Sequence, residues 1–408
     1  MLVSILCFAN VGVSQAQTFN SGSNGSDGAL NLTTPGTIIF DPKSFTPPLN
    51  PAGDNVYNFT TINIAAGVTV KLTSKVLTGP VYWLATGDVT IGGIVDLSGE
   101  TGHGFVGTAG ERIPAAGGAG GYLGGVGGSS SAGFPSAEPG NGPGGGPVGT
   151  YTGPFGRTCT NGGTFTGSQF LIPLVGGSGG SGGSLAGSLG AGGGGGGGAI
   201  LIASSTQIRL LSGAASILAN GGAGGAPFQG CQNNGDGGPG SGGAIRLIAP
   251  YVNGGTLSAY GGNLNATGTG YLGNGVIRVE AYTFGGANIA GGVLIQSTPF
   301  SPAVPVTPPS SIKVTSIVTS TGTIPINANP FSFPDATINT SAPVTVNVQA
   351  QYVPLGTVPK VLVISETGPD QTVNCSPLAG TLQQSTCSAS ITFPTGGSRG
   401  FVKATWTQ

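Results

Sequence analysis

Seven consecutive glycines, Gly192 to Gly198, open the stretch that decides the fold, and the apolar phrase AILIA follows them directly at 199–203. Two later phrases repeat the pattern after a glycine: GAIRLIA at 243–249 and GVIRVEA at 275–281. A second apolar phrase and then a Gly-Gly pair follow each of the three. Repeated units of this kind predict strands that stack on one another and share one core.

The composition points to an all-β protein. The chain has 82 glycines and 30 prolines among 408 residues, which brings it close to low-complexity sequence. Disordered chains are usually polar and highly charged, whereas only 6% of these residues are charged and the mean hydropathy is positive. The glycines do not recur at every third position, so a collagen triple helix is excluded. No long stretch shows the three-and-four spacing of a helix.

Residues 55–100 extend the repeat upstream. Short apolar phrases, such as those at 68–72, 81–85 and 94–97, are separated by glycines. This pattern is typical of a sandwich, a barrel or a β-solenoid. The repeats favour the solenoid, because coils that pack mainly on their neighbours accept insertions of unequal length. We therefore predict a parallel β-helix (β-solenoid) over residues 55–296, with an N-terminal cap at 17–54.

The glycine-rich region at 101–198 is predicted to be a long insertion in this solenoid. It contains one predicted strand, Gln169 to Val175, and it is far too long for an ordinary loop. Glycine has no Cβ, so extended glycine chains can approach each other closely. The scarcity of charge and the interspersed aromatic residues favour a compact but irregular layer over disorder.

The composition changes toward the C-terminus. Prolines recur through residues 297–310, which predicts an extended linker. Beyond it, apolar and polar residues alternate, as in Val344, Val346 and Val348. About a hundred residues with such strands predict an Ig-like β-sandwich at 311–408.

The N-terminus and the cysteines both indicate export. Residues 1–16 are mostly apolar and end in Ser14-Gln15-Ala16, which predicts a secretory signal peptide, although no Lys or Arg precedes the apolar run. An even number of cysteines in an exported chain favours disulfides. The four cysteines beyond the signal allow three pairings, and proximity favours Cys375 with Cys387 and Cys159 with Cys231. No CxxC spacing suggests a metal site. We expect a secreted or cell-surface protein whose mature chain does not span a membrane.

The order of the phrases at 68–70, 87–91, 94–99 and 242–247 resembles that of exported bacterial glycine-rich surface proteins. This resemblance covers roughly residues 55–290. It implies a right-handed parallel β-helix of the kind seen in filamentous haemagglutinin and autotransporter passengers. The C-terminal residues resemble the Ig-like modules of bacterial surface proteins, and the glycine tracts resemble the stacked polyglycine helices of phage tail-tip adhesins. The resemblance implies no catalytic residue.

Asp88, Asp96, Glu100 and His103 form the best candidate site. Glycosidases use two carboxyl groups at a defined separation, so these residues would bind or cleave a polysaccharide. The alternative is that Asp88 and Asp96 lie at turns, where they cap backbone amides or solvate the strand edge, and that His103 is a solvated loop residue. We favour this alternative, because glycines interrupt the strands between the acids and a fold alone says little about activity.

Three further residues outside this group have two interpretations each. Asp236, in the phrase Asn-Gly-Asp-Gly-Gly at 234–238, resembles a calcium-binding turn, but a single acid favours a plain turn. Arg246 and Arg278 occupy matching positions in two repeats. They would either form a small ladder or simply point to solvent.

The near-zero net charge limits the function classes. With 12 basic and 13 acidic residues, the chain has a net charge of -1 and lacks the basic excess that nucleic acid or anionic lipid requires. We predict a non-enzymatic structural or adhesive protein that needs no cofactor and no metal. Its expected partners are further copies of itself, an extracellular polysaccharide or a cell-surface ligand. The alternative function is a carbohydrate-binding or polysaccharide-cleaving protein.

Overall fold

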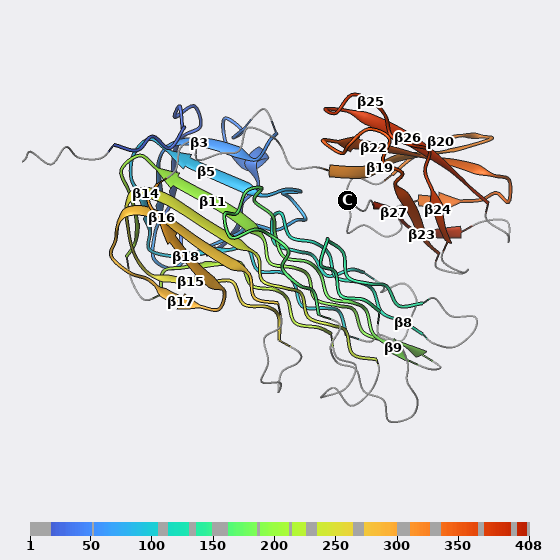
Figure 1. The fold of residues 1–408 in the computed structure, drawn as a ribbon, viewed down its shortest axis with the longest axis horizontal. Coiled ribbons are helices and arrows are strands. Elements are labelled where there is room, and N and C mark those ends of the chain that lie inside the picture. Colours follow the sequence, from blue (N-terminus) through green and yellow to red (C-terminus); the bar gives the residue numbers. More distant parts are fainter. Residues whose placement is uncertain are drawn as a thin grey trace, which may run out of the picture.

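The protein is described by a computed structural model, drawn in Figure 1, and the described part is all-β apart from one 3-10 turn, η1 (Pro42–Ser44). The predicted signal peptide, Cys159, Cys231 and residues 300–310 of the predicted linker lie outside the described residues. The described residues are 18–50, 53–104, 113–129, 136–148, 162–185, 188–211, 214–225, 235–263, 273–299, 311–326, 336–365, 371–392 and 398–405.

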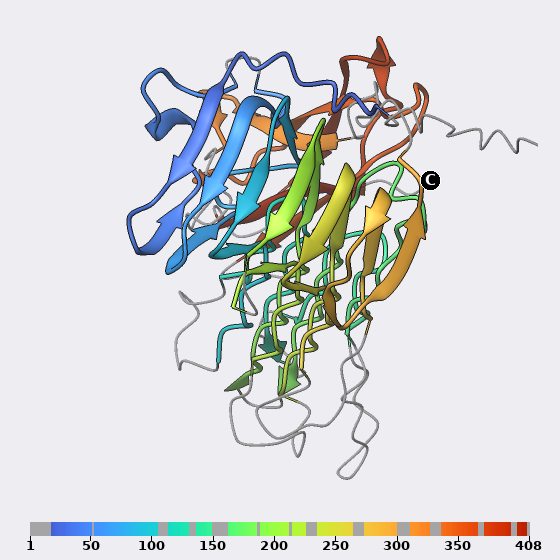
Figure 2. The same ribbon diagram turned by 90° about the vertical axis from the view of Figure 1, so that its left-hand side faces the viewer.

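A nine-stranded sheet, parallel throughout, contains the apolar phrases of the repeat (Figure 2). Its main path is, in spatial order, β11 (Ala199–Ser204), β5 (Val81–Ala85), β3 (Val56–Ile64), β6 (Val89–Ile91), β12 (Gln207–Leu210), β14 (Ala244–Gly254), β16 (Val276–Phe284) and β18 (Val293–Ser297). The ninth strand, β1 (Gly28–Leu32), pairs with β3. Ala199 lies opposite Ala244, which lies opposite Val276, so the three repeated phrases are direct neighbours in register, as the sequence predicts.

The predicted parallel β-helix with an insertion is wrong. The pairings run from β11 through β5, β3, β6 and β12 to β14, and β14 pairs with β11 again, so these six parallel strands close into a ring. The closure arises because β3 pairs with both β5 and β6, while β14 pairs with both β11 and β12. Two long strands therefore continue through the position at which their neighbours are broken by a turn.

A six-stranded parallel sheet encloses the main core together with the first sheet. Its strands are β17 (Asn288–Ala290), β15 (Thr256–Ser258), β13 (Ser216–Leu218), β7 (Ile94–Asp96), β4 (Val68–Lys71) and β2 (Gly36–Ile39). Alternate apolar side chains of both sheets are buried in one cluster. At one end of this cluster the Phe40 ring lies 5.4 Å from Trp83 and 5.2 Å from Tyr57.

The glycine-rich segments form a hydrogen-bonded layer and not an insertion. The N–H groups of residues 191–198 donate in turn to three neighbouring segments of the same polypeptide. Gly192, Gly195 and Gly198 donate to the segment 97–103, Gly193 and Gly196 to 122–125, and Gly194 and Gly197 to 238–241. The directions repeat every three residues, which is the period of a polyproline II helix, whose N–H groups have no internal partners. The predicted layer is therefore compact, but the prediction that it is irregular is wrong.

At most glycines of this run, the spacing between the neighbouring segments leaves no room for a side chain. A Cβ on Gly195 would lie 2.0 Å from the carbonyl oxygen of Ala116, and one on Gly196 would lie 1.9 Å from that of Gly177. Figures 1 and 2 show the extended chains running side by side from the parallel sheets toward three short strands. These are β8 (Gly128–Ser129), β9 (Ser184–Leu185) and β10 (Ser188–Leu189). Glycine is required here for close backbone approach rather than for turns.

The C-terminal residues form two antiparallel sheets on a core of their own. One sheet has the order β20 (Gly322–Pro325), β19 (Ser311–Thr319), β22 (Val344–Gln351), β26 (Ser385–Ile391) and β25 (Ala379–Gly380). The other has the order β21 (Ala336–Ile338), β27 (Ser398–Thr405), β23 (Lys360–Ser365) and β24 (Gln371–Asn374). In β22 the alternating valines, Val344, Val346 and Val348, are all buried.

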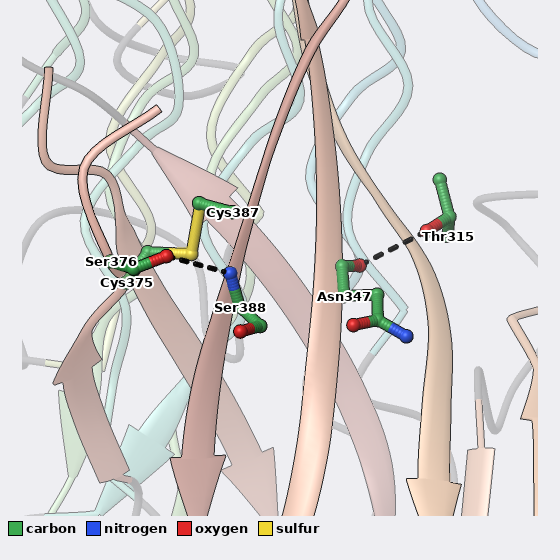
Figure 3. The surroundings of a disulfide bond; sticks show 6 residues. All are labelled: Thr315, Asn347, Cys375, Ser376, Cys387 and Ser388. Atoms are coloured by element: carbon green, nitrogen blue, oxygen red, sulfur yellow. Dashed lines mark hydrogen bonds between the residues drawn. A yellow bond between two sulfur atoms is a disulfide. The ribbon is translucent and has the colours of Figure 1, made fainter. Parts of the chain in front are cut away.

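A disulfide joins Cys375 to Cys387, as predicted (Figure 3). Cys375 directly follows β24, whereas Cys387 lies in β26 of the other sheet. The bond therefore links the two antiparallel sheets, although its two cysteines are only 12 residues apart in the sequence. Beside it, the backbone N–H of Ser388 donates to the hydroxyl of Ser376 at 3.2 Å.

Removal of this disulfide is expected to destabilise the C-terminal sheets. The Cys375→Ala/Cys387→Ala variant frees a link between residues separated by 12 positions. The unfolding free energy should then fall by about 3 kcal/mol, because closing a loop of this size restricts the unfolded chain. Guanidinium unfolding of the full chain, monitored by hydrogen exchange in β24 and β26, measures the loss. Ser376→Ala is the matched control, and an equal effect of both variants would contradict the prediction.

Candidate functional site

Asp88 is the first of the four predicted site residues, and it serves the turn before β6. Its side chain is exposed, and its two carboxylate oxygens accept hydrogen bonds from Thr206 Oγ1 at 2.5 Å and from Gln207 Nε2 at 2.8 Å. Both donors lie where the chain enters β12, the strand that pairs with β6. The carboxylate thus joins the turns that precede two neighbouring strands of the nine-stranded sheet, β6 and β12.

Asp96 and Glu100 are held in separate ion pairs. Asp96 Oδ2 lies 2.8 Å from Lys71 Nζ on the paired strand β4, and its Oδ1 accepts from the backbone N–H of Ser98 at 2.8 Å. Glu100 Oε1 pairs with Lys75 Nζ, and its Oε2 accepts from the backbone N–H of Ala116 at 3.1 Å. The predicted capping of a backbone amide is confirmed for Asp96, whereas Asp88 accepts its hydrogen bonds from side chains.

His103 has an exposed side chain, and its backbone belongs to the glycine layer. The carbonyl groups of Glu100 and His103 accept from Gly195 at 2.9 Å and Gly192 at 2.8 Å. Their separation of three residues is therefore the period of the layer. No hydrogen bond or ion pair within the described ranges joins any two of the four predicted residues. The structure gives each acid structural partners of its own.

A buried ion cluster lies elsewhere, on the outer face of the nine-stranded sheet. Arg246 of β14 and Arg278 of β16 are cross-strand neighbours, so the predicted ladder is confirmed. The alternative, that both point to solvent, is wrong, because the two residues are only 1% and 8% exposed. Glu280, two residues after Arg278 and fully buried, accepts from Arg246 Nε at 2.9 Å and from Arg278 Nε at 2.7 Å through the same oxygen, Oε1. The role of Glu280 was not predicted from the sequence. The signal for it is an acid two positions after a base within an apolar strand, because this spacing puts both side chains on one face.

Residues 169–174, which we call the strap, cover this cluster. The carbonyl of Gln169 accepts from Arg278 Nη1 at 3.4 Å, and the guanidinium of Arg278 lies 5.4 Å from the centre of the Phe170 ring. Leu171 and Leu174 are buried in an apolar cluster with Tyr82 and Leu201 of the sheet. The predicted strand at 169–175 is wrong: the strap forms turns and contains a cis bond before Pro173.

Burial raises the pKa of Tyr82 to about 12, and the positive charge of Arg246 acts in the opposite direction. Tyr82 is paired with Leu201, which is paired with Arg246 on the next strand, so the three side chains form one row on the outer face of the sheet. The phenol therefore remains protonated and neutral at physiological pH beside the ion cluster.

Asp236 lies in the glycine layer and is a half-buried residue. Both of its carboxylate oxygens are buried, and no group in the described part of the chain donates to them. Burial raises its pKa to about 6. Within the described ranges, no three His, Cys, Asp or Glu side chains gather in a way that could hold a metal ion. The calcium-turn interpretation thus gains no further acidic ligand there.

The stability of the glycine layer is expected to fall as pH rises from about 4 to about 6. The pKa of Asp236 is raised in the fold from 3.8 to about 6, so the folded state retains its proton over this interval while the unfolded state loses it. Asp236→Asn should flatten this part of the pH profile and stabilise the protein at pH 7. Urea unfolding between pH 4 and pH 7 measures both effects. Asp88→Asn, at an exposed acid, is the control, and an unchanged slope in Asp236→Asn would contradict the assignment.

The described residues contain no helix of the length and apolar character needed to cross a membrane.

Comparison of the chain with protein families, curated proteins and solved structures finds no match. The functional interpretation therefore depends on the geometry of this chain alone.

Proposed function

We propose that the protein is a non-enzymatic, exported structural or adhesive protein whose glycine layer is a rigid support. The observation that carries this proposal is the hydrogen-bonded lattice around residues 191–198. Its N–H groups donate to three neighbouring segments of the same chain, and the acceptor segment repeats every three residues. At positions such as Gly195 and Gly196 this lattice admits no side chain that could reach a substrate, because a Cβ there would overlap a neighbouring carbonyl group. The residues of this lattice thus serve the packing of the backbone.

The surface chemistry supports contact rather than catalysis. Asp88, Asp96 and Glu100 are each engaged by neighbouring side chains or amides, which supports a structural role for these acids. Only 6% of residues are charged, and the net charge is -1. A nearly neutral surface rich in hydroxyl and amide groups suits contact with polysaccharide, a cell-surface ligand or other copies of the chain.

The Asp96→Ala/Glu100→Ala variant tests this function against the enzymatic alternative. The purified chain is incubated with intact cells and with immobilised extracellular polysaccharide, and bound protein and released reducing ends are both measured. We expect binding without cleavage, and we expect the double variant to bind as the unaltered chain does. Its stability should fall by only about 1 kcal/mol for each lost ion pair, because both pairs are partly exposed. Cleavage that the double variant abolishes would overturn the proposal.

A further inference from the structure

Arg246 is the most deeply buried basic group in the described part of the chain. Its side chain is 1% exposed, and it lies near the start of strand β14, among buried apolar residues. On one side it neighbours Leu201 of β11, and on the other it neighbours Arg278 of β16. A guanidinium group in such surroundings needs acceptors for its five N–H donors, since an unpaired buried donor costs free energy.

The donors of the two arginines are used unequally. Arg246 directs Nε and Nη2 to the same oxygen, Oε1 of Glu280, at 2.9 Å and 2.8 Å. Arg278 directs Nε to that oxygen, Nη1 to the carbonyl of Gln169, and Nη2 to Ser297 Oγ at 2.9 Å. The Nη1 nitrogen of Arg246 is buried and makes no hydrogen bond to any of the described residues.

The charges of this cluster are also uneven, because two guanidinium groups share one carboxylate oxygen. Bringing two arginines out of water is expensive unless their charge is compensated and their donors are satisfied. A neutral acceptor would satisfy Nη1 but would leave the charge as it is. A small anion would do both.

We propose that Arg246 Nη1 binds a small inorganic anion, of which chloride is the simplest, in the buried layer between the nine-stranded sheet and the strap. The burial of Arg246 excludes larger ligands, such as sugar acids or peptides. The strap already contacts the cluster through Gln169 and Phe170. The bound anion would therefore stabilise the strap on the sheet, and its affinity would appear as stability of the folded chain.

Thermal unfolding in chloride and in isethionate, at equal ionic strength, tests the proposal. Isethionate is too large to enter a fully buried site, so general salt effects are matched. Chloride should raise the melting temperature with saturation, and at ten times its Kd the ratio of folded to unfolded chain should rise about tenfold. Arg246→Met should remove this chloride-specific increment. Arg209→Met, at an exposed arginine of β12 in the same sheet, should retain it. Equal stability of the unaltered chain in both salts would overturn the proposal.

A crystallographic measurement on the unaltered chain keeps the test independent of how the variant folds. Crystals grown or soaked in bromide should show an anomalous peak at hydrogen-bond distance from Arg246 Nη1. If ordered water, a main-chain oxygen or a side chain occupies this position instead, with no anomalous signal, the anion site does not exist. The experiment does not depend on the adhesive function, because neither readout involves a partner or a polysaccharide.

Discussion

Gly195→Ala is expected to destabilise the protein by about 3 kcal/mol or more. The added Cβ would lie 2.0 Å from the carbonyl oxygen of Ala116, and the N–H of Gly195 also donates to Glu100 in an adjacent chain. Overpacking of a side chain often relaxes through a rotamer change, but here the obstacle is backbone that is itself hydrogen-bonded on several sides. The chains would have to move apart, and several hydrogen bonds would weaken together. Guanidinium unfolding and hydrogen exchange of the amides at 191–198 measure the effect.

Gly192→Ala is the matched control, because it makes the same change in the same run of glycines. A Cβ on Gly192 would lie no closer than 3.4 Å to any neighbouring atom, which is an ordinary contact. We expect its stability to stay within about 1 kcal/mol of the unaltered chain, since alanine restricts the unfolded chain at little cost in the fold. Equal destabilisation by the two substitutions would show that the close packing around Gly195 does not limit which residue fits there.

Glu280→Gln is expected to cost about 3–5 kcal/mol of unfolding free energy. The substitution preserves the shape of the side chain but removes the charge that Arg246 and Arg278 share. Breaking a buried ion pair by removing one partner leaves an uncompensated charge, and this is far more costly than losing an exposed pair. Thermal and denaturant unfolding would measure the change, and the strap should become more accessible to protease because Arg278 contacts Gln169 and Phe170.

Glu100→Gln gives the exposed counterpart of the same substitution. Glu100 pairs with Lys75, and the two side chains are 33% and 42% exposed. Its loss should cost no more than about 1 kcal/mol. If Glu280→Gln were as mild as Glu100→Gln, the ion cluster would not be a stabilising element of the nine-stranded sheet.

The sequence predicts strand identity and neighbour relations well, because both depend on local patterns. The matching phrases at 199, 244 and 276 carry the same apolar period, and shared burial requires them to align. Closure of the strands into a ring depends on β3 and β14 continuing where β5 and β11 end. Short turns decide which strands are interrupted and which continue. The spacing of apolar residues does not show how these turns change the pairing of strands across the sheet.

The candidate site shows a different limit. Asp96 is correctly interpreted as a capping residue, because short-range spacing governs a bond such as that from Ser98 to Asp96. The ion cluster depends on the burial of charged residues inside apolar strands. From the sequence of a single strand, a charged residue is expected to face solvent. Segments distant in sequence, among them the strap about a hundred residues upstream of β16, cover the outer face of the sheet and bury it.

The three-residue repeat of the glycine layer also restricts which insertions and deletions the glycine run can accept. Each amide in the run from 191 to 198 faces one of three neighbours in strict rotation. Adding or losing one or two codons would turn every later amide toward the wrong neighbour, whereas a change of three codons would preserve the phase. Replication slippage in repetitive glycine codons should therefore leave a signature of lengths that differ by multiples of three amino acids.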